Sequence, residues 1–372
     1  MSVNAPPVSA GEAFEILLAG WKAQEAGGLT ASWMLHGRPG VGKTEIVRQL
    51  AERIGARLFD LRLTTIEPQD LRGLPYFDHE TKKTIWYRPE DLPDDPATPS
   101  VLFLDELTAA SPWLQPTVYG LLQERRVGRH EVPPSVFIVA AGNDVEDGAV
   151  AHELGTALSD RLIHLLVRAS APDWLANYAA RRGLHPAVSA FIRARPDLLE
   201  TTEEAMRRGW AIACTPRSWE RVSQVLRAAP ERRVRDAMVA GIVGEAAAAE
   251  FARVADDVEA SVRIDALLAA RPADRPNLYP ESLDGLNALV YGLVGAADEA
   301  RIGRAIEVMA ELRRLARLRP IPVFSRAPLA ELTAFGFEMM MRKALDEGLE
   351  SAFLSSPAYA EYVAERRLAG LE

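Results

Sequence analysis

A glycine-rich stretch near the N-terminus, residues 31–44 with the sequence ASWMLHGRPGVGKT, constrains the fold of this chain more than any other feature. The apolar run 33–35 is typical of a buried strand, and the spacing G-x-x-x-x-G-K-T follows it over residues 37–44. Glycines let backbone N–H groups approach a polyphosphate, and the N-terminus of a following helix adds unpaired N–H groups and a positive dipole end. The stretch therefore predicts a strand, a phosphate-binding loop and a helix in succession.

Every residue of this loop is a candidate for nucleotide binding. The predicted binding residues are Gly37, Arg38, Pro39, Gly40, Val41, Gly42, Lys43 and Thr44. We expect Lys43 to reach the β- and γ-phosphates and the hydroxyl of Thr44 to coordinate Mg²⁺. A chance glycine turn is the alternative, but all the fixed positions of the motif are filled and the strand–loop–helix context is right.

A second candidate element is the segment 101–106, VLFLDE. Four apolar residues in a row are typical of a central parallel strand buried on both faces, and ligands of open α/β sheets bind at the carboxyl ends of such strands. We expect Asp105 to hold Mg²⁺ through its waters and Glu106 to orient or deprotonate the attacking water. The segment is a weak signal alone, and it gains weight from the phosphate loop that precedes it.

The remaining strands and helices alternate along the first half of the chain. Further strands are predicted at 57–63, 135–141 and 162–167, with helices at 9–26, 43–54 and 113–124 and a loose tail at 1–8. This alternation predicts a doubly wound, parallel, five-stranded α/β sheet of the P-loop type. Asn143 follows the strand 135–141, where its amide could position the catalytic water; an ordinary turn asparagine is the alternative.

Residues 66–97 interrupt the alternating pattern. The segments 74–77 and 84–87 carry four aromatic residues and flank a polar turn, which predicts a β-hairpin with Lys82 and Lys83 at its tip. Packing against the domain and contact with a substrate are equally consistent with this pattern.

Composition limits the possible functions. The net charge of −9 counts against binding of duplex nucleic acid. A single cysteine, Cys214, excludes an internal disulfide and fits a reducing compartment. The sequence shows no signal peptide and no apolar run long enough to cross a membrane, so we expect a cytoplasmic protein. We find no N-K-x-D motif of the kind a GTPase uses to recognise its base.

Residues 31–219 resemble an AAA+ ATPase, and more narrowly one of the MoxR type. The motifs that carry the resemblance are GRPGVGKT (37–44, Walker A), VLFLDE (101–106, Walker B), AAGND (140–144, sensor 1), LSDRL (158–162) and CTPRSW (214–219), together with the insert TIEPQDLRGLP (65–75). The two Walker motifs are specific to nucleotide hydrolysis, and the ordered set is specific to AAA+ proteins. In the family, a phenylalanine often follows the arginine of the fourth motif, which is Arg161 here; in this chain that position is Leu162.

The resemblance implies three further site residues besides Glu106. Asn143 matches sensor 1, Arg161 matches the arginine finger that acts on a neighbouring subunit, and Arg217 matches sensor 2 on a helical lid. A surface arginine paired with its neighbour is the alternative for Arg161, and Arg125 and Arg126 compete with it for the trans-acting role.

The predicted organisation has three parts: an AAA+ nucleotide-binding core at 1–170 with an insert hairpin at about 66–97, a helical lid at 171–255 and a helical C-terminal domain at 256–372. Apolar stripes at helical spacing support the last two assignments.

The resemblance implies an ATPase that uses ATP and Mg²⁺, assembles as a ring, most often a hexamer, and remodels or matures a protein partner as a chaperone. Such proteins often work with a von Willebrand factor A-domain protein. Two alternatives stay open: a nucleic-acid translocase or restriction-type motor, which would need a basic pore face, and a nucleotide-gated scaffold with little turnover.

Overall fold

The structure is a computed structural model that describes residues 4–143, 159–228 and 231–368. The chain divides into two compact units, which are described separately. The first contains residues 1–169 and 202–209, and the second contains residues 170–201 and 210–372. The predicted division of the helical part at residue 255 stays a prediction.

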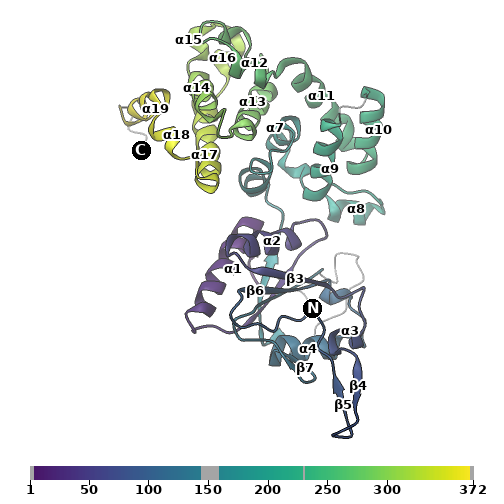
Figure 1. The fold of residues 1–372 in the computed structure, drawn as a ribbon. Helices are drawn as coiled ribbons and strands as arrows, with labels where there is room; N and C mark the ends of the chain where they lie inside the picture. The colour runs from purple at the N-terminus through teal and green to yellow at the C-terminus, as the bar shows by residue number, and fades with distance from the viewer. Residues whose placement is uncertain (1–3, 144–158, 229–230, 369–372) are drawn as a thin grey trace. The chain divides into compact units, whose positions relative to one another are not determined.

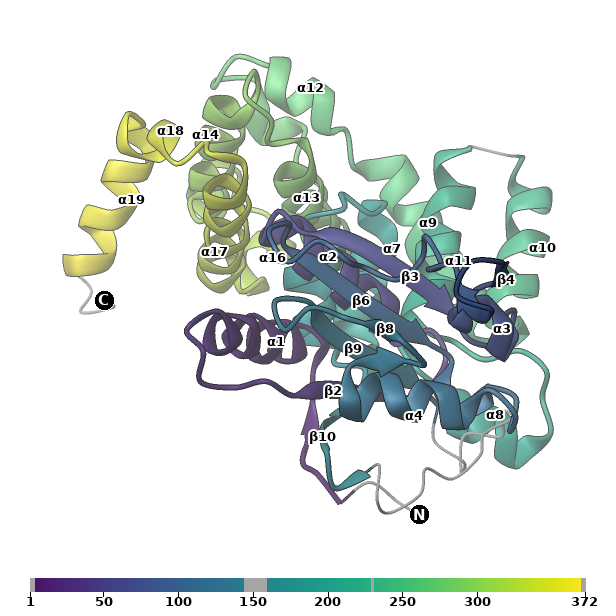
Figure 2. The same ribbon diagram turned by 60° about the horizontal axis from the view of Figure 1, so that its bottom comes forward.

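A parallel sheet forms the centre of the first unit (Figures 1 and 2). Its strands in spatial order are β1 (Pro7–Val8), β10 (Leu162–Val167), β2 (Ser32–His36), β9 (Phe137–Gly142), β6 (Ser100–Asp105) and β3 (Arg57–Arg62). The five predicted strands are therefore confirmed, and so is the parallel α/β architecture. The loose tail was wrong in part, because Pro7 and Val8 pair with Leu166 and Val167 as a sixth strand. Two residues are too few to show a strand periodicity in a sequence.

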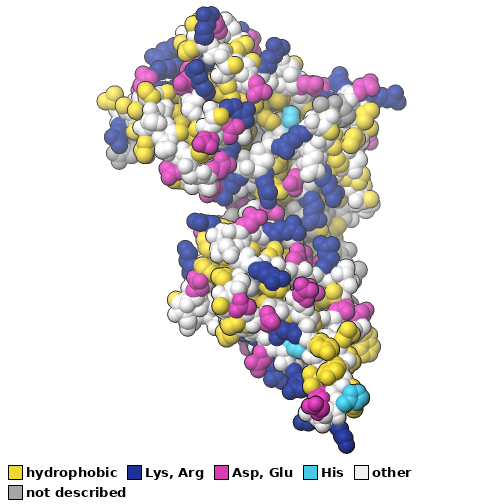
Figure 3. All heavy atoms as spheres, viewed as in Figure 1, with side chains coloured by type: hydrophobic (Ala, Val, Ile, Leu, Met, Phe, Trp, Pro, Cys, Tyr) yellow, Lys and Arg dark blue, Asp and Glu magenta, His cyan; other side chains and the backbone are white. Residues whose placement is uncertain are grey.

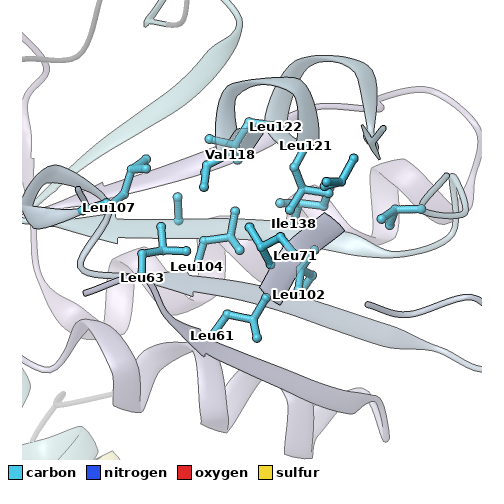
Figure 4. Packing of buried hydrophobic residues seen from close by; sticks show 14 of the residues in the cluster. Leu61, Leu63, Leu71, Leu102, Leu104, Leu107, Val118, Leu121, Leu122 and Ile138 are labelled. Carbon is cyan, nitrogen blue, oxygen red and sulfur yellow. The ribbon is translucent and has the colours of Figure 1, made fainter. Parts of the chain in front are cut away.

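Helices cover both faces of the sheet because successive side chains of a strand point to opposite faces. On β6, Val101 and Phe103 pack in one apolar cluster, while Leu102 and Leu104 pack in the other. The first cluster lies beneath α1 (Ala10–Glu25) and α2 (Lys43–Arg53); the second lies beneath α3 (Pro68–Arg72) and α4 (Gln115–Glu124) (Figure 4). This double burial explains the uninterrupted apolar runs of the central strands.

Two hairpins project from the second of these faces. The predicted insert hairpin is confirmed as β4 (Pro75–Asp78) paired antiparallel with β5 (Lys83–Trp86), and a smaller hairpin pairs β7 (Arg126–Val127) with β8 (His130–Glu131). His130 Nε2 donates to the carbonyl of Arg72 over 3.1 Å, and Arg88 donates to the carbonyl of Glu131 over 2.9 Å. These bonds fasten the base of the longer hairpin to the shorter one.

The second unit is helical. Its helices are α6 (Ala171–Asp173), α7 (Pro186–Ala194), α9 (Pro216–Arg227), α10 (Arg232–Val243), α11 (Glu245–Ser261), α12 (Ile264–Ala269), α13 (Leu283–Ala296), α14 (Ile302–Leu312), α15 (Leu315–Leu318), α16 (Pro322–Arg326), α17 (Leu329–Glu347), α18 (Ser351–Leu354) and α19 (Pro357–Leu368). Phe191, Trp219 and Phe251 meet in its core with ring centroids 5.2–5.6 Å apart. Within the described part of the chain, no helix combines the length and apolar character needed to span a membrane.

Candidate nucleotide-binding site

The phosphate loop lies between β2 and α2, as the motif predicts. Gly37, Gly40 and Gly42 have positive φ angles of 156°, 85° and 108°. At Gly37 a Cβ would also lie 2.5 Å from the carbonyl oxygen of Val167, so glycine is required there for two reasons. The helix α2 begins at Lys43, directly after Gly42. The loop therefore presents the N-terminus of an 11-residue helix, which favours an anion.

Lys43 lies at the centre of the site and is buried, although its side chain carries a charge. Its Nζ donates to the carbonyl oxygens of Gly37 and Arg38 and, over 2.9 Å, to Oδ1 of Asn143. Asn143 directly follows the end of β9, which is the neighbour of β2 in the sheet. The structure therefore brings together two predicted residues that lie 100 positions apart.

Thr44 and Asp105 form a second contact between predicted residues. The hydroxyl of Thr44 donates to Oδ2 of Asp105 over 3.1 Å, which links the start of α2 to the end of β6. A hydroxyl and a carboxylate oxygen at this spacing are the hard donors that Mg²⁺ prefers, and Mg²⁺ keeps several waters beside one or two protein ligands. The donor set therefore fits a magnesium ion.

Glu106 occupies a left-handed backbone conformation, with φ of 60°. Its carboxylate accepts a hydrogen bond from the hydroxyl of Thr64, and Arg62 Nε lies 3.8 Å from its other oxygen. The Glu106 side chain is 38% exposed, so water can reach it. Arg62 is the last residue of the neighbouring strand β3, and Thr64 follows two positions later. Both were missed in the sequence analysis, because neither belongs to a motif and their contact with Glu106 depends on the pairing of β3 with β6.

The loop arginine has a partner far along the chain. Arg38 donates to Oε2 of Glu203 over 2.9 Å. Glu203 lies on α8 (Thr202–Arg208), which belongs to the same compact unit as the loop. The hydrogen bond from Arg38, followed by its charge, lowers the pKa of the Glu203 carboxyl. Only the fold could reveal this contact, since 165 positions separate the two residues.

A pair of histidines lies at the start of the phosphate loop. His36 precedes Gly37, and its Nε2 lies 2.8 Å from Nδ1 of His164 on β10. His164 Nε2 donates to the carbonyl of Ser159 over 2.9 Å, so Nδ1 of a neutral His164 accepts from His36. Burial lowers the pKa of His164, which favours this neutral form. The pair connects the strand before the loop to the segment before Arg161.

The three arginines considered for a trans-acting role differ in their contacts and exposure. Arg125 donates to the carbonyls of Pro133 and Val136, and burial lowers its pKa to about 10. Its guanidinium therefore binds the backbone of the segment that follows the β7–β8 hairpin. Arg126 pairs with Glu124 over 3.4 Å on the surface. Arg161 is exposed in the turn before β10. Its role as the arginine finger stays a prediction.

Arg217 lies in the second compact unit. It is exposed at the start of α9, where Thr215 accepts from Ser218 N over 3.1 Å and Ser218 Oγ accepts from Thr215 N over 2.7 Å. This cap confirms the helix start that the proline of the motif indicates, while the sensor role of Arg217 stays a prediction. Two motif residues, Asp144 and Leu158, lie outside the described residues.

Comparison with known proteins agrees with this arrangement. A family model described as an AAA domain of the dynein-related subfamily matches residues 32–162. The chain is 35% identical over 102 residues to the ATPase family gene 2 protein homolog B of Mus musculus, and 30% identical over 118 residues to the uncharacterized protein YeaC of Bacillus subtilis. These matches cover 27% and 30% of this chain. They span only 11% and 35% of the two relatives.

Among solved structures, a RuvB variant from Thermotoga maritima aligns over 89% of this chain and 91% of its own, with 15% identity and a TM-score of 0.33. This score is too low to bear on the fold, which rests on the parallel sheet itself. The family match covers β2, α2, β6 and β9, and so includes the phosphate loop, Asp105, Glu106 and Asn143. Residues 32–162 of this chain are therefore similar to an AAA domain.

Proposed function

We propose that this chain hydrolyses ATP with Mg²⁺ as cofactor. The observation that carries the proposal is the convergence of three strand ends, β2, β6 and β9, on one site through the Lys43–Asn143 contact of 2.9 Å and the Thr44–Asp105 contact of 3.1 Å. Lys43 would bind phosphate, Thr44 and Asp105 would hold a hard cation, and Asn143 supplies a side-chain amide beside them. The name of the murine relative, an ATPase, supports the same reaction.

Each residue has a separate part in the proposed reaction. The glycine loop and Lys43 bind the phosphates, while Thr44 and Asp105 hold the magnesium ion, which offsets charge on the phosphate oxygens. Glu106 orients or deprotonates the attacking water, and its partial exposure suits contact with water. Asn143 orients the reacting groups through its amide.

The proposal includes assembly into a ring, with a hexamer expected. Arg161 would then act on the nucleotide of the next subunit, where a guanidinium offsets charge that spreads over the γ-phosphoryl oxygens. The exposed position of Arg161 and the bonds of Arg125 to backbone carbonyls support Arg161 over Arg125, and Arg126 remains the other candidate for the trans-acting role. Arg217 would report the nucleotide to the helical unit.

The energy of hydrolysis would remodel a protein partner, as expected of a MoxR-type chaperone in the cytoplasm, and a von Willebrand factor A-domain protein is one candidate partner. The hairpin β4–β5 supports a protein-contacting role. Leu74, Tyr76, Phe77 and Tyr87 on it are all more than 40% exposed, and Figure 3 shows hydrophobic and basic side chains gathered along it. Exposed apolar patches mark interaction sites.

Phosphate release from ATP tests the reaction. We expect turnover by the full chain and loss of nucleotide binding in Lys43→Ala, because the ammonium that faces the phosphates is removed. Lys22→Ala is the matched control, since Lys22 is an exposed lysine on α1 of the same unit. Retained ATP affinity in Lys43→Ala would contradict the site assignment.

A second measurement tests the partner class. Turnover is measured with a permanently unfolded protein, casein, and with single- and double-stranded DNA. We expect casein to stimulate hydrolysis and Phe77→Ser to reduce that stimulation while basal turnover stays unchanged, since Phe77 is 54% exposed and supports no core. Stimulation by DNA alone would favour the translocase.

A further inference from the structure

Thr108 makes an unusual double contact with the tip of β9. Its hydroxyl oxygen accepts from the backbone N–H of Asn143 over 3.0 Å and donates to the carbonyl oxygen of the same residue over 3.1 Å. Asn143 lies beyond the last paired residue of β9, Gly142, which pairs with His36. Buried backbone groups need partners. One threonine side chain therefore does for Asn143 what a neighbouring strand does for the residues before it.

The position of Thr108 is itself well determined. It lies in the short 3₁₀ turn Leu107–Ala109 that follows Glu106, and only 5% of it is exposed. Leu107 is fully buried in the core, and Ala109 N donates to the carbonyl of Glu106 over 3.0 Å. A Cβ on Gly142 would lie 2.6 Å from the methyl group of Thr108, so the two segments pack in direct contact. Small shifts of either segment are resisted by this packing.

The contact continues into the phosphate loop. Asn143 uses its backbone for Thr108 and its side-chain oxygen for Lys43, whose Nζ lies 2.9 Å away. A continuous path of bonds therefore runs from the turn after Glu106, through Thr108 and Asn143, to Lys43. Nothing in the motif spacing of the sequence indicates Thr108.

We propose that Thr108 is a positioning residue that holds the carboxamide of Asn143 in place for ATP hydrolysis. This inference rests on the proposed ATPase function and goes further by naming what orients Asn143. Thr108 acts through Asn143 and leaves the phosphate loop intact. Its loss should therefore lower kcat while the KM for ATP changes little.

The central variant is Thr108→Val, which keeps the shape of the side chain and removes the hydroxyl. We expect kcat to fall about tenfold or more with KM within about threefold, because two partly buried backbone groups of Asn143 lose their partner. Thr108→Ser keeps the hydroxyl and should retain most of the turnover. Thr333→Val is the matched control: Thr333 is fully buried, and its hydroxyl donates to Leu329 O over 2.8 Å in the other unit.

Hydrogen exchange supplies a readout that does not depend on turnover. In the absence of nucleotide, the backbone N–H of Asn143 should exchange faster in Thr108→Val than in the wild type. In Thr108→Ser it should be protected as in the wild type. Thr333→Val should leave this amide unchanged. A double variant with Asn143→Ala should lose little more turnover than Asn143→Ala alone, since the two residues act as one unit.

The outcomes separate the two proposals. A wild-type chain that does not hydrolyse ATP overturns the proposed function. An active wild type overturns the role of Thr108 if Thr108→Val keeps its kcat, if both valine variants lower kcat equally, or if the Asn143 amide stays protected. Should Thr108→Val fail to fold, a folded Thr108→Ser protein with an unprotected Asn143 amide would equally overturn it.

Discussion

A side chain on Gly73 would place its Cβ 1.7 Å from the carbonyl oxygen of Tyr87. Gly73 ends α3, has a φ of 87°, and lies at the base of the β4–β5 hairpin, where Tyr87 N donates to Leu74 O over 3.0 Å. The backbone on the two sides of the hairpin base can approach this closely only because residue 73 has no Cβ. The way the hairpin joins the rest of the first compact unit thus depends on one glycine.

This relationship predicts a large effect of Gly73→Ala. Both the overlap and the positive φ oppose a side chain, so we expect the free energy of unfolding to fall by about 3 kcal/mol. Urea denaturation measures it. Gly28→Ala is the control, because its Cβ would lie 3.5 Å from Ala23 O, an ordinary contact, and should change stability by less than about 0.5 kcal/mol. Equal stability of the two variants would contradict the geometry.

Glu106→Gln should bind ATP and fail to turn it over. The amide keeps the shape of the side chain but cannot accept a proton from water, so we expect kcat to fall on the order of 100-fold or more with affinity within a few-fold. Phosphate release and nucleotide binding are measured side by side. Glu124→Gln is the control, since the Glu124 side chain is 65% exposed and pairs with Arg126 on the surface. Normal turnover in Glu106→Gln would remove Glu106 from its role.

Arg161 is tested by mixing subunits. Arg161→Ala alone should lower turnover by about 10³-fold, because charge on the γ-phosphoryl oxygens loses its partner. Lys43→Ala subunits keep Arg161, and Arg161→Ala subunits keep the loop, so a mixed ring contains complete sites and should regain activity. Phosphate release across mixing ratios measures this. The absence of rescue at every ratio would count against a trans-acting Arg161.

His185 predicts a pH dependence of stability in the helical unit. Burial, with a smaller contribution from the charge of Arg227, lowers the pKa of His185 to about 4, below the ordinary histidine value of 6.5. Between these values the unfolded chain takes up a proton that the folded chain does not. The free energy of unfolding therefore falls as the pH drops from 6.5 towards 4, by up to about 1.4 kcal/mol per pH unit.

The variant His185→Asn should reduce this slope. Asparagine does not titrate, and its side-chain oxygen can replace Nδ1 of His185 as the acceptor for Ala187 N at the start of α7. Chemical denaturation at several pH values measures the slope. Above pH 7 the two proteins should respond to pH alike, because His185 is neutral in both states. An unchanged slope between pH 6.5 and 4 would contradict the prediction.

Local sequence patterns were sufficient for much of the fold and the site. The five long strands, the loop at 37–44 and the β4–β5 hairpin follow from apolar runs, glycine spacing and turn residues, which act over a few positions. Residues from separate motifs, such as Thr44 and Asp105, could be grouped because parallel strands end at the same edge of a sheet. The short strand β1 carried too few residues to be recognised.

What the sequence determined, then, is a phosphate loop, a buried strand ending in two acids, and the parallel sheet that carries them. Only the tertiary structure decided which side chains hold these groups: Thr64 binds Glu106, and Thr108 binds Asn143. It also decided that Arg125 binds the backbone of the segment after the β7–β8 hairpin. A sequence motif consists of residues whose spacing is fixed by one local backbone structure, such as a loop or a strand end. Contacts between segments depend on how sheets and helices pack, and a single sequence contains no periodicity that reports them.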